Sequence, residues 1–149
     1  MITISNLTKD DFESAYTIET ISHIIPWSKN TFLSNQGDHY LNKKITLNNK
    51  IVGFLISHVI LDEATLFNIA IDPAHRKKGL AKKLLTALID ELTTQNVTNL
   101  WLEVRASNIA AINLYEQLGF NQLTIRKNYY PTLDNKSEDA IIMAYTISF

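Results

Sequence analysis

The chain contains no cysteine among its 149 residues. This absence excludes a disulfide framework, a thiolate metal site and a covalent acyl-cysteine intermediate. The four histidines, at positions 23, 39, 58 and 75, are not spaced like metal ligands. The sequence therefore predicts neither a metal centre nor a cysteine nucleophile.

Glycine and proline are also scarce, with four and three residues, and there is no repeat or low-complexity segment. No apolar run approaches the ~18 residues of a membrane-spanning helix. The opening segment MITISNLTKDDF has the features of neither a signal peptide nor a transit peptide. With 46% hydrophobic residues, the chain is long enough for one core and too short for two ordinary domains. We therefore expect one domain over residues 1–149, located in the cytoplasm.

Alternating and helical patterns divide the chain into strands and helices. The predicted strands are residues 2–7, 40–47, 51–60, 64–72, 97–104, 122–130 and 140–147, with a polar loop at 131–139. The predicted helices are residues 8–22, a short helix from about 28, 80–92 and 108–118, the last ended by Gly119. Strands and helices alternate only in the second half. This order indicates an α+β or mixed α/β fold with a central sheet.

The net charge is only −1, so the chain has no overall positive field for nucleic acid or an anionic membrane. Its basic residues gather locally instead. The segment HRKKGLAKKLL, residues 75–85, has four lysines and an arginine around Gly79, and no acidic residue occurs from His75 to Ile89. Any anion site must therefore be a local cluster, and this segment is the candidate.

The basic segment opens the predicted helix 80–92, where cations are unfavourable. A helix N-terminus carries a partial positive charge and disfavours each added cation by about 0.3 to 1 kcal/mol. A bound anion reverses this, because the free backbone N–H groups, the dipole and the lysines then all face one ligand. Gly79 lets the backbone approach that ligand closely. A solvated lysine face is the alternative, but the glycine and the preceding strand favour an anion site.

The segment RKKGLA fits the pattern R/Q-x-x-G-x-G/A, and it fits neither a triphosphate-binding loop nor a dinucleotide fingerprint. It resembles the pyrophosphate-binding motif of the GNAT superfamily of acyl-CoA-dependent N-acetyltransferases. Further segments are similar, in order and spacing, to the bacterial members that acetylate the N-terminal alanine of a small-subunit ribosomal protein, the eighteenth. These segments are PWSKNTF, SNQGDHYLN, LDEATLFNIAIDP, LWLEVRASNIAAINLYEQLGF, NYYPT and EDAIIMA. The resemblance covers essentially the full chain.

The resemblance implies a mixed, mainly antiparallel sheet, splayed near its middle to admit acetyl-CoA, with helices on both faces. It implies that the backbone of Ile69, Ala70 and Ile71 pairs with the pantetheine arm and that Asn108 contacts the cofactor. It also implies a pyrophosphate cradle with Arg76 at its entrance, made of Lys77, Lys78, Gly79, Leu80, Ala81 and Lys82. Ala81 stands where glycine is common in this group, and alanine is an accepted alternative.

The resemblance gives Glu103 and Tyr115 the catalytic roles. Glu103 lies on the strand face opposite Leu100 and Leu102 and would be the general base, acting directly or through water. Tyr115 lies two helical turns after Asn108 and would protonate the departing thiolate. With no cysteine to carry the acetyl group, we expect direct transfer in a ternary complex. The alternatives are a solvent-facing glutamate and a core tyrosine.

Several residues are candidates for contact with a substrate peptide. The loops that flank the peptide entrance in this family contain Trp27, Tyr129 and Tyr130. Glu138 and Asp139 could attract a basic residue near the substrate's N-terminus. All five could equally be ordinary loop anchors or solvated groups. Rival functions are acetylation of a small amine, lysines or other N-termini, and RNA binding without chemistry, which the near-neutral charge disfavours.

Overall fold

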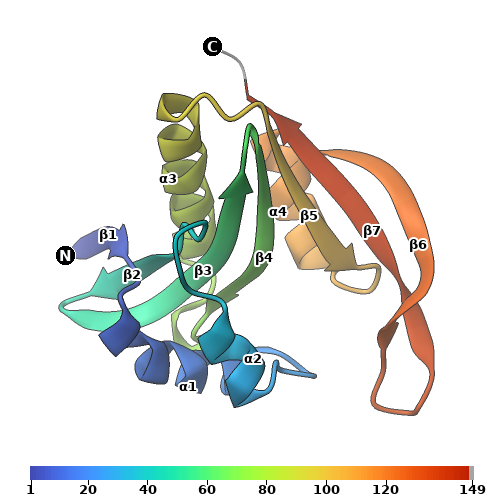
Figure 1. Cartoon of the computed structure of the whole chain (residues 1–149). Coiled ribbons are helices and arrows are strands. Elements are labelled where there is room, and N and C mark those ends of the chain that lie inside the picture. Colours follow the sequence, from blue (N-terminus) through green and yellow to red (C-terminus); the bar gives the residue numbers. More distant parts are fainter. Residues whose placement is uncertain (148–149) are drawn as a thin grey trace.

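The computed structural model describes residues 1–147, which contain one seven-stranded sheet in the order β1-β2-β3-β4-β5-β7-β6 (Figure 1). Only the β4–β5 pair is parallel among these neighbours. The strands are β1 (Ile2–Asn6), β2 (Lys43–Leu47), β3 (Lys50–Ile60), β4 (Glu63–Ile71), β5 (Asn99–Arg105), β6 (Asn121–Pro131) and β7 (Ser137–Thr146). The predicted mixed, mainly antiparallel sheet is confirmed.

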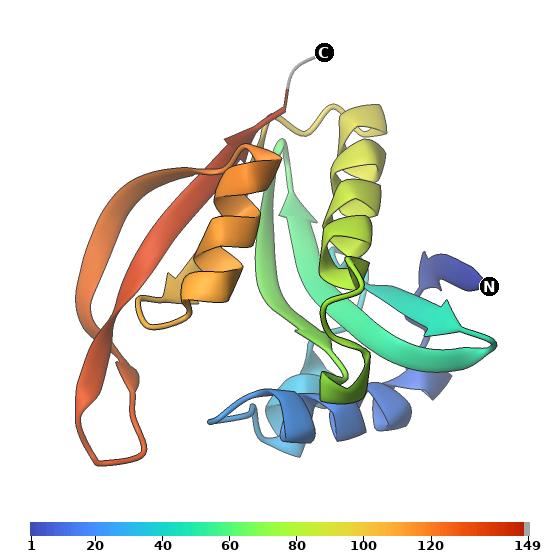
Figure 2. The same ribbon diagram turned by 180° about the vertical axis from the view of Figure 1, so that it is seen from behind.

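Helices cover both faces of the sheet. The four α-helices are α1 (Phe12–Ser22), α2 (Lys29–Ser34), α3 (Leu80–Thr94) and α4 (Ile109–Leu118), and short 3-10 turns precede α1 and α3 at Lys9–Asp11 and Pro73–His75. Helices α3 and α4 lie side by side on the face seen in Figure 2, whereas α1 and α2 pack near the opposite face. None of the helices in residues 1–147 is long and apolar enough to cross a membrane.

Each face of the sheet has its own cluster of buried apolar side chains. The regular periods at which apolar residues recur in the helices and strands explain both clusters. Helix α3 buries Leu80, Leu84, Leu85, Leu88 and Leu92 against one face, and each fully buried leucine contributes about 1.5 to 3 kcal/mol. On the other face Phe32 of α2 packs edge-on against Phe54 of β3. The two clusters fix the helices on opposite sides of the sheet.

The sheet splits open between β4 and β5. These strands pair from Glu63 and Asn99 only as far as Leu66 and Leu102, although both strands continue beyond that point. The next residue of β4, Phe67, is a bulge, because Leu66 pairs with Ser57 while Asn68 pairs with Ile56. A bulge bends its strand and increases the local twist. The bulge thus lies where β4 parts from β5, and the two halves of the sheet diverge from there (Figure 1).

The element bounds differ from the predicted ones mainly in three places. Helix α1 begins at Phe12 rather than at 8, because Lys9–Asp11 form a 3-10 turn. Strand β2 begins at Lys43 rather than at 40, because Tyr40 makes only an isolated bridge with His58. Strands β6 and β7 extend into the predicted polar loop, reaching Pro131 and starting at Ser137. Their register resumes after an irregularity, so the polar residues there pair across the hairpin.

Candidate active site

A cleft of about 380 Å³ lies where β4 and β5 diverge. Residues of α1 and α4, which belong to the apolar clusters on opposite faces of the sheet, both line it. Its lining includes Glu19, His23 and Trp27 from α1 and the following segment, Asn68 and Ile69 from β4, Glu103 and Arg105 from β5, Asn108 and Tyr115 from the start and middle of α4, and Tyr130 from β6.

Tyr115 contributes a buried phenol to this cleft. The residue is 5% exposed, and burial, with a smaller contribution from Tyr130, raises the pKa of its hydroxyl. No described residue forms a hydrogen bond with this hydroxyl, although Tyr115 lines the cleft. Asn108 caps α4 by accepting a hydrogen bond from the backbone N–H of Ala111 at 3.3 Å. The cap and the phenol therefore line one wall of the cleft.

Glu103 faces away from the core because β5 alternates, with Leu100, Leu102 and Val104 buried on its other face. Arg126 of β6 donates a hydrogen bond from Nη1 to Glu103 Oε1 at 3.2 Å. The Glu103 side chain is 34% exposed and lines the cleft. Arg126 thus orients a carboxylate that incoming groups can still reach.

Tyr130 forms the rim of the cleft and is held by Arg105. The Arg105 guanidinium lies 4.6 Å from the Tyr130 ring centroid and donates a hydrogen bond to the Pro131 carbonyl at 2.7 Å. Burial and then the nearby charge of Glu103 raise the pKa of Tyr130 to about 12. Its hydroxyl therefore remains protonated near neutral pH and can act as a hydrogen-bond donor at the rim.

Glu138, Asp139 and Tyr129 do not line the cleft. Glu138 accepts hydrogen bonds from the Ser107 N–H at 3.0 Å and from Arg105 at 3.3 Å. Asp139 accepts one from the Asn128 N–H at 3.0 Å. The two carboxylates already have partners within the chain, which brace the rim and the β6–β7 hairpin.

The basic loop lies at the start of α3 and has an unusual backbone. Lys77 and Gly79 both have positive φ, 64° and 74°, and Gly79 is the N-cap of α3 without any side-chain cap. The first turn of α3 contains no acidic residue, so no carboxylate of that turn accepts a hydrogen bond from its free N–H groups. Arg76 points back toward α1 and donates a hydrogen bond to the Ser22 carbonyl at 3.3 Å.

The structure therefore brings together only part of the predicted cofactor set. Ile69 and Asn108 line the cleft, whereas Ala70, Ile71 and residues 76–82 do not. The basic loop follows the end of β4 after a single 3-10 turn. An extended ligand that reaches both the loop and the cleft would have to run along β4. The described residues contain no group of three or more histidine, aspartate or glutamate side chains placed to hold a metal ion.

Comparison with known proteins decides the family. The sequence profile of the Acetyltransferase (GNAT) family matches residues 1–120. The chain belongs to the GNAT family. It is 60% identical over 148 residues to the [ribosomal protein bS18]-alanine N-acetyltransferase of Escherichia coli K12, covering 99% of each chain. It is 51% identical over 144 residues to the enzyme of the same name from Haemophilus influenzae, covering 97% of this chain and 98% of the other.

A solved structure agrees with these similarities. The crystal structure of the ribosomal-protein-S18-alanine N-acetyltransferase from Escherichia coli superposes with a TM-score of 0.97 at 59% sequence identity, covering 100% of this chain and 96% of that one. The splayed GNAT sheet expected from the sequence is confirmed.

Four polar residues of this GNAT cleft were not predicted: Glu19, His23, Asn68 and Arg105. A signal was available in the sequence for two of them. Glu19 lies four residues after Ala15 and seven after Phe12, on the buried stripe of α1, where a carboxylate needs partners. Asn68 carried a similar signal, because it interrupts the alternating buried stripe of Ala64, Leu66 and Ala70 in β4. His23 carried no such signal.

Replacing Gly79 with alanine should weaken coenzyme A binding. At φ 74° a side chain is strained, whereas a Cβ would meet no atom within 4 Å, so we expect a stability loss of about 1 kcal/mol. The added methyl group would lie where an anion approaches the backbone, and we expect the dissociation constant to rise about tenfold, or about 1.4 kcal/mol. Calorimetric titration with coenzyme A measures this change.

The matched control is Gly37→Ala. Gly37 also has positive φ, at 140°, and a Cβ added there would likewise meet no atom within 4 Å, but Gly37 does not line the cleft. This variant should lose stability without losing affinity for coenzyme A. Equal affinities for the Gly79 variant and the unchanged protein would contradict a phosphate site at this loop.

Proposed function

We propose that this protein transfers the acetyl group of acetyl-CoA to the N-terminal alanine of ribosomal protein bS18. The observation that carries the proposal is the 60% identity, over 99% of both chains, to the Escherichia coli enzyme named for that reaction. A ribosomal substrate assigns the reaction to the cytoplasm. Because the cleft draws residues from Glu19 to Pro131, we also propose that residues 1–149 act as one catalytic domain.

The open edge of β4 is the proposed binding site for the pantetheine arm. Beyond Leu66 this strand pairs with β3 on one side and has no β5 partner on the other. An extended chain with amide groups can add to such an edge by backbone hydrogen bonds, here through Ile69, Ala70 and Ile71. The pyrophosphate would then bind at residues 76–82, and the thioester would enter the cleft beside Asn108.

The transfer begins with deprotonation of the substrate's α-ammonium group, for which Glu103 is the proposed base. The amine nitrogen attacks the thioester carbonyl carbon, the carbon–sulfur bond breaks, and Tyr115 donates its proton to the departing sulfur. Because burial raises the pKa of Tyr115, the phenol is fully protonated before the reaction. Since a thiol, with a pKa of about 8.5, is more acidic than a tyrosine phenol, with an ordinary pKa of about 10, this proton transfer must be concerted with bond cleavage.

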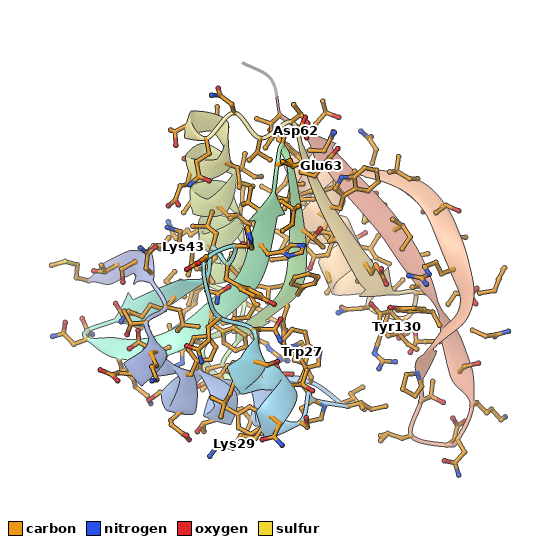
Figure 3. The ribbon with its side chains drawn as sticks, viewed as in Figure 1. Trp27, Lys29, Lys43, Asp62, Glu63 and Tyr130 are labelled. Atoms are coloured by element: carbon orange, nitrogen blue, oxygen red, sulfur yellow. The ribbon has the colours of Figure 1, made fainter. Side chains whose placement is uncertain are left out.

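The substrate peptide would enter between Trp27 and Tyr130, which come from opposite sides of the cleft (Figure 3). The Trp27 backbone is fixed by a hydrogen bond from its N–H to Glu19 Oε2 at 2.9 Å. Arg105 fixes Tyr130 from the other side. Two aromatic side chains on braced backbones can enclose the first residues of an extended peptide. Tyr129, Glu138 and Asp139 lie outside this opening, so we assign them to its support.

The test is incubation of the purified protein with acetyl-CoA and a hexapeptide that begins with alanine, followed by mass spectrometry. The expected product carries one acetyl group on its α-amine. A control peptide with a formylated N-terminus and one internal lysine should remain unmodified. Acetylation of that lysine, or of free amines in preference to the peptide, would contradict the proposal. In cells that lack this protein, bS18 should retain an unmodified N-terminal alanine.

A further inference from the structure

Opposite the catalytic tyrosine, the cleft wall contains a connected group of polar side chains. Glu19 of α1 is 1% exposed, and its Oε1 accepts a hydrogen bond from Asn68 Nδ2 at 2.8 Å. His23 Nε2 lies 2.9 Å from Asn68 Oδ1 and 3.4 Å from Glu19 Oε1. All three residues line the cleft, and the reaction described above uses none of them.

The hydrogen bonds of this group determine where the imidazole carries its proton. A carboxylate only accepts, so the Asn68 amide nitrogen must face Glu19 and the Asn68 oxygen must face His23. His23 Nε2 therefore meets two acceptors and must be the protonated nitrogen. The other nitrogen, Nδ1, makes no hydrogen bond with another described residue. The His23 side chain is 35% exposed and lines the cleft, so an incoming group can approach the ring.

Two elements hold this ring in place. On α1, the buried carboxylate of Glu19 contacts the imidazole directly, and His23 itself is the C-cap of that helix. Strand β4 contributes the uncharged Asn68. Of the cations in this region, Arg76 reaches only the neighbouring backbone, and Arg105 lines the cleft from β5.

We propose that His23 is a further catalytic residue, which accepts a proton from the substrate amine through Nδ1 while Glu19 and Asn68 hold its ring in place. The inference rests on the proposed function and deepens it. An ammonium group that becomes an amide loses two protons. Glu103 takes one as the nitrogen becomes nucleophilic, and His23 takes the other as the carbon–nitrogen bond forms. Tyr115 gives one proton to the sulfur and takes up one proton before the next turnover. Of the two protons lost by the nitrogen, one is thus balanced by the new thiol and the other leaves to solvent.

The ordinary pKa values of imidazole and carboxylate groups agree with the transfer of one proton to each of these two residues. An α-amino group has an ordinary pKa of about 7.7 to 8.0, and imidazole, at about 6.5, lies closer to it than a carboxylate does at about 4.3. A proton acceptor is most effective when its affinity for the proton is close to that of the donor and to the working pH. A cleft with both types can therefore remove both protons without waiting for bulk water.

The first test compares His23→Gln with the unchanged protein in the alanine-peptide assay. Glutamine can still donate a hydrogen bond to Asn68, but it cannot accept a proton. We expect kcat to fall about 100-fold with no change in KM for acetyl-CoA. The control is His39→Gln at an exposed histidine outside the cleft, which should leave both constants unchanged. Thermal unfolding midpoints of both variants establish that they are folded.

The second test uses His23→Ala with added imidazole. Imidazole that enters the vacated space should restore activity in a saturable way and in proportion to its neutral fraction, which a purely structural role for His23 would not produce. Wild-type activity in His23→Gln, or a loss in His23→Ala that imidazole leaves unchanged, would overturn the inference alone. An unchanged protein that leaves the alanine peptide unmodified would instead overturn the proposed function, and the inference with it.

Discussion

Tyr115→Phe should lower kcat by about 100-fold or more and leave the affinity for acetyl-CoA unchanged. The substitution removes only the hydroxyl, which has no described protein partner. The ring keeps its packing against Phe120, whose ring centroid lies 5.6 Å from that of Tyr115. Without that hydroxyl, the sulfur must leave as an unprotonated thiolate. Steady-state kinetics with the alanine peptide gives kcat, and titration with acetyl-CoA gives the affinity.

The control for this prediction is Tyr145→Phe. Tyr145 also packs against Phe120, with the two ring centroids 5.5 Å apart. It does not line the cleft, so its hydroxyl should be dispensable for activity. Equal kcat values for Tyr115→Phe and the unchanged protein would refute the acid role.

The alkaline side of the pH profile tests the same residue. Burial raises the pKa of Tyr115, so its protonated, active form persists above the ordinary phenol value. Activity should therefore show no loss from Tyr115 ionisation up to about pH 10. A decline of kcat in the unchanged protein near pH 9, absent from Tyr115→Phe, would mean that the phenol ionises earlier than the structure indicates.

Much of this fold follows from patterns that are local in the sequence. The stripe of leucines from Leu80 to Leu92 defines α3, and the alternation around Glu103 defines which face of β5 is buried. Gly119 ends α4 in the left-handed conformation, as predicted, with φ 108°. Such features need only the 3.6-residue and two-residue periods of helices and strands, so a single sequence contains them.

The opening of the sheet and half of the cleft wall depend on contacts between distant segments. The Phe67 bulge is a mismatch between β3 and β4, which neither strand reveals alone. The contact between Glu19 and Asn68 joins residues 49 positions apart. Likewise, Glu138 is occupied by Arg105 and Ser107 across 33 and 31 positions. Local patterns could place these residues on elements, but they could not identify their partners.

Glu103→Gln should lower kcat/KM for the alanine peptide by about 100-fold near neutral pH. Glutamine keeps the size of the side chain but cannot take the proton of the α-ammonium group. The expected loss depends on pH in a defined direction. The ordinary pKa of an α-amino group is about 7.7 to 8.0, so at higher pH more substrate arrives already deprotonated and the base is needed less. The loss should therefore shrink as the pH rises and grow as it falls.

The variant Arg126→Gln distinguishes the role of Glu103 as a proton acceptor from its role in an ion pair. This variant keeps Glu103 but removes the 3.2 Å contact with Arg126. Because the Arg126 side chain is half-exposed, its pairing adds little to stability, and both variants should unfold near the temperature of the unchanged protein. Arg126→Gln should lose less activity than Glu103→Gln, since the proton acceptor remains. Equal losses would make the ion pair, rather than proton transfer, the function of Glu103, and a loss that stays constant across the pH range would lead to the same conclusion.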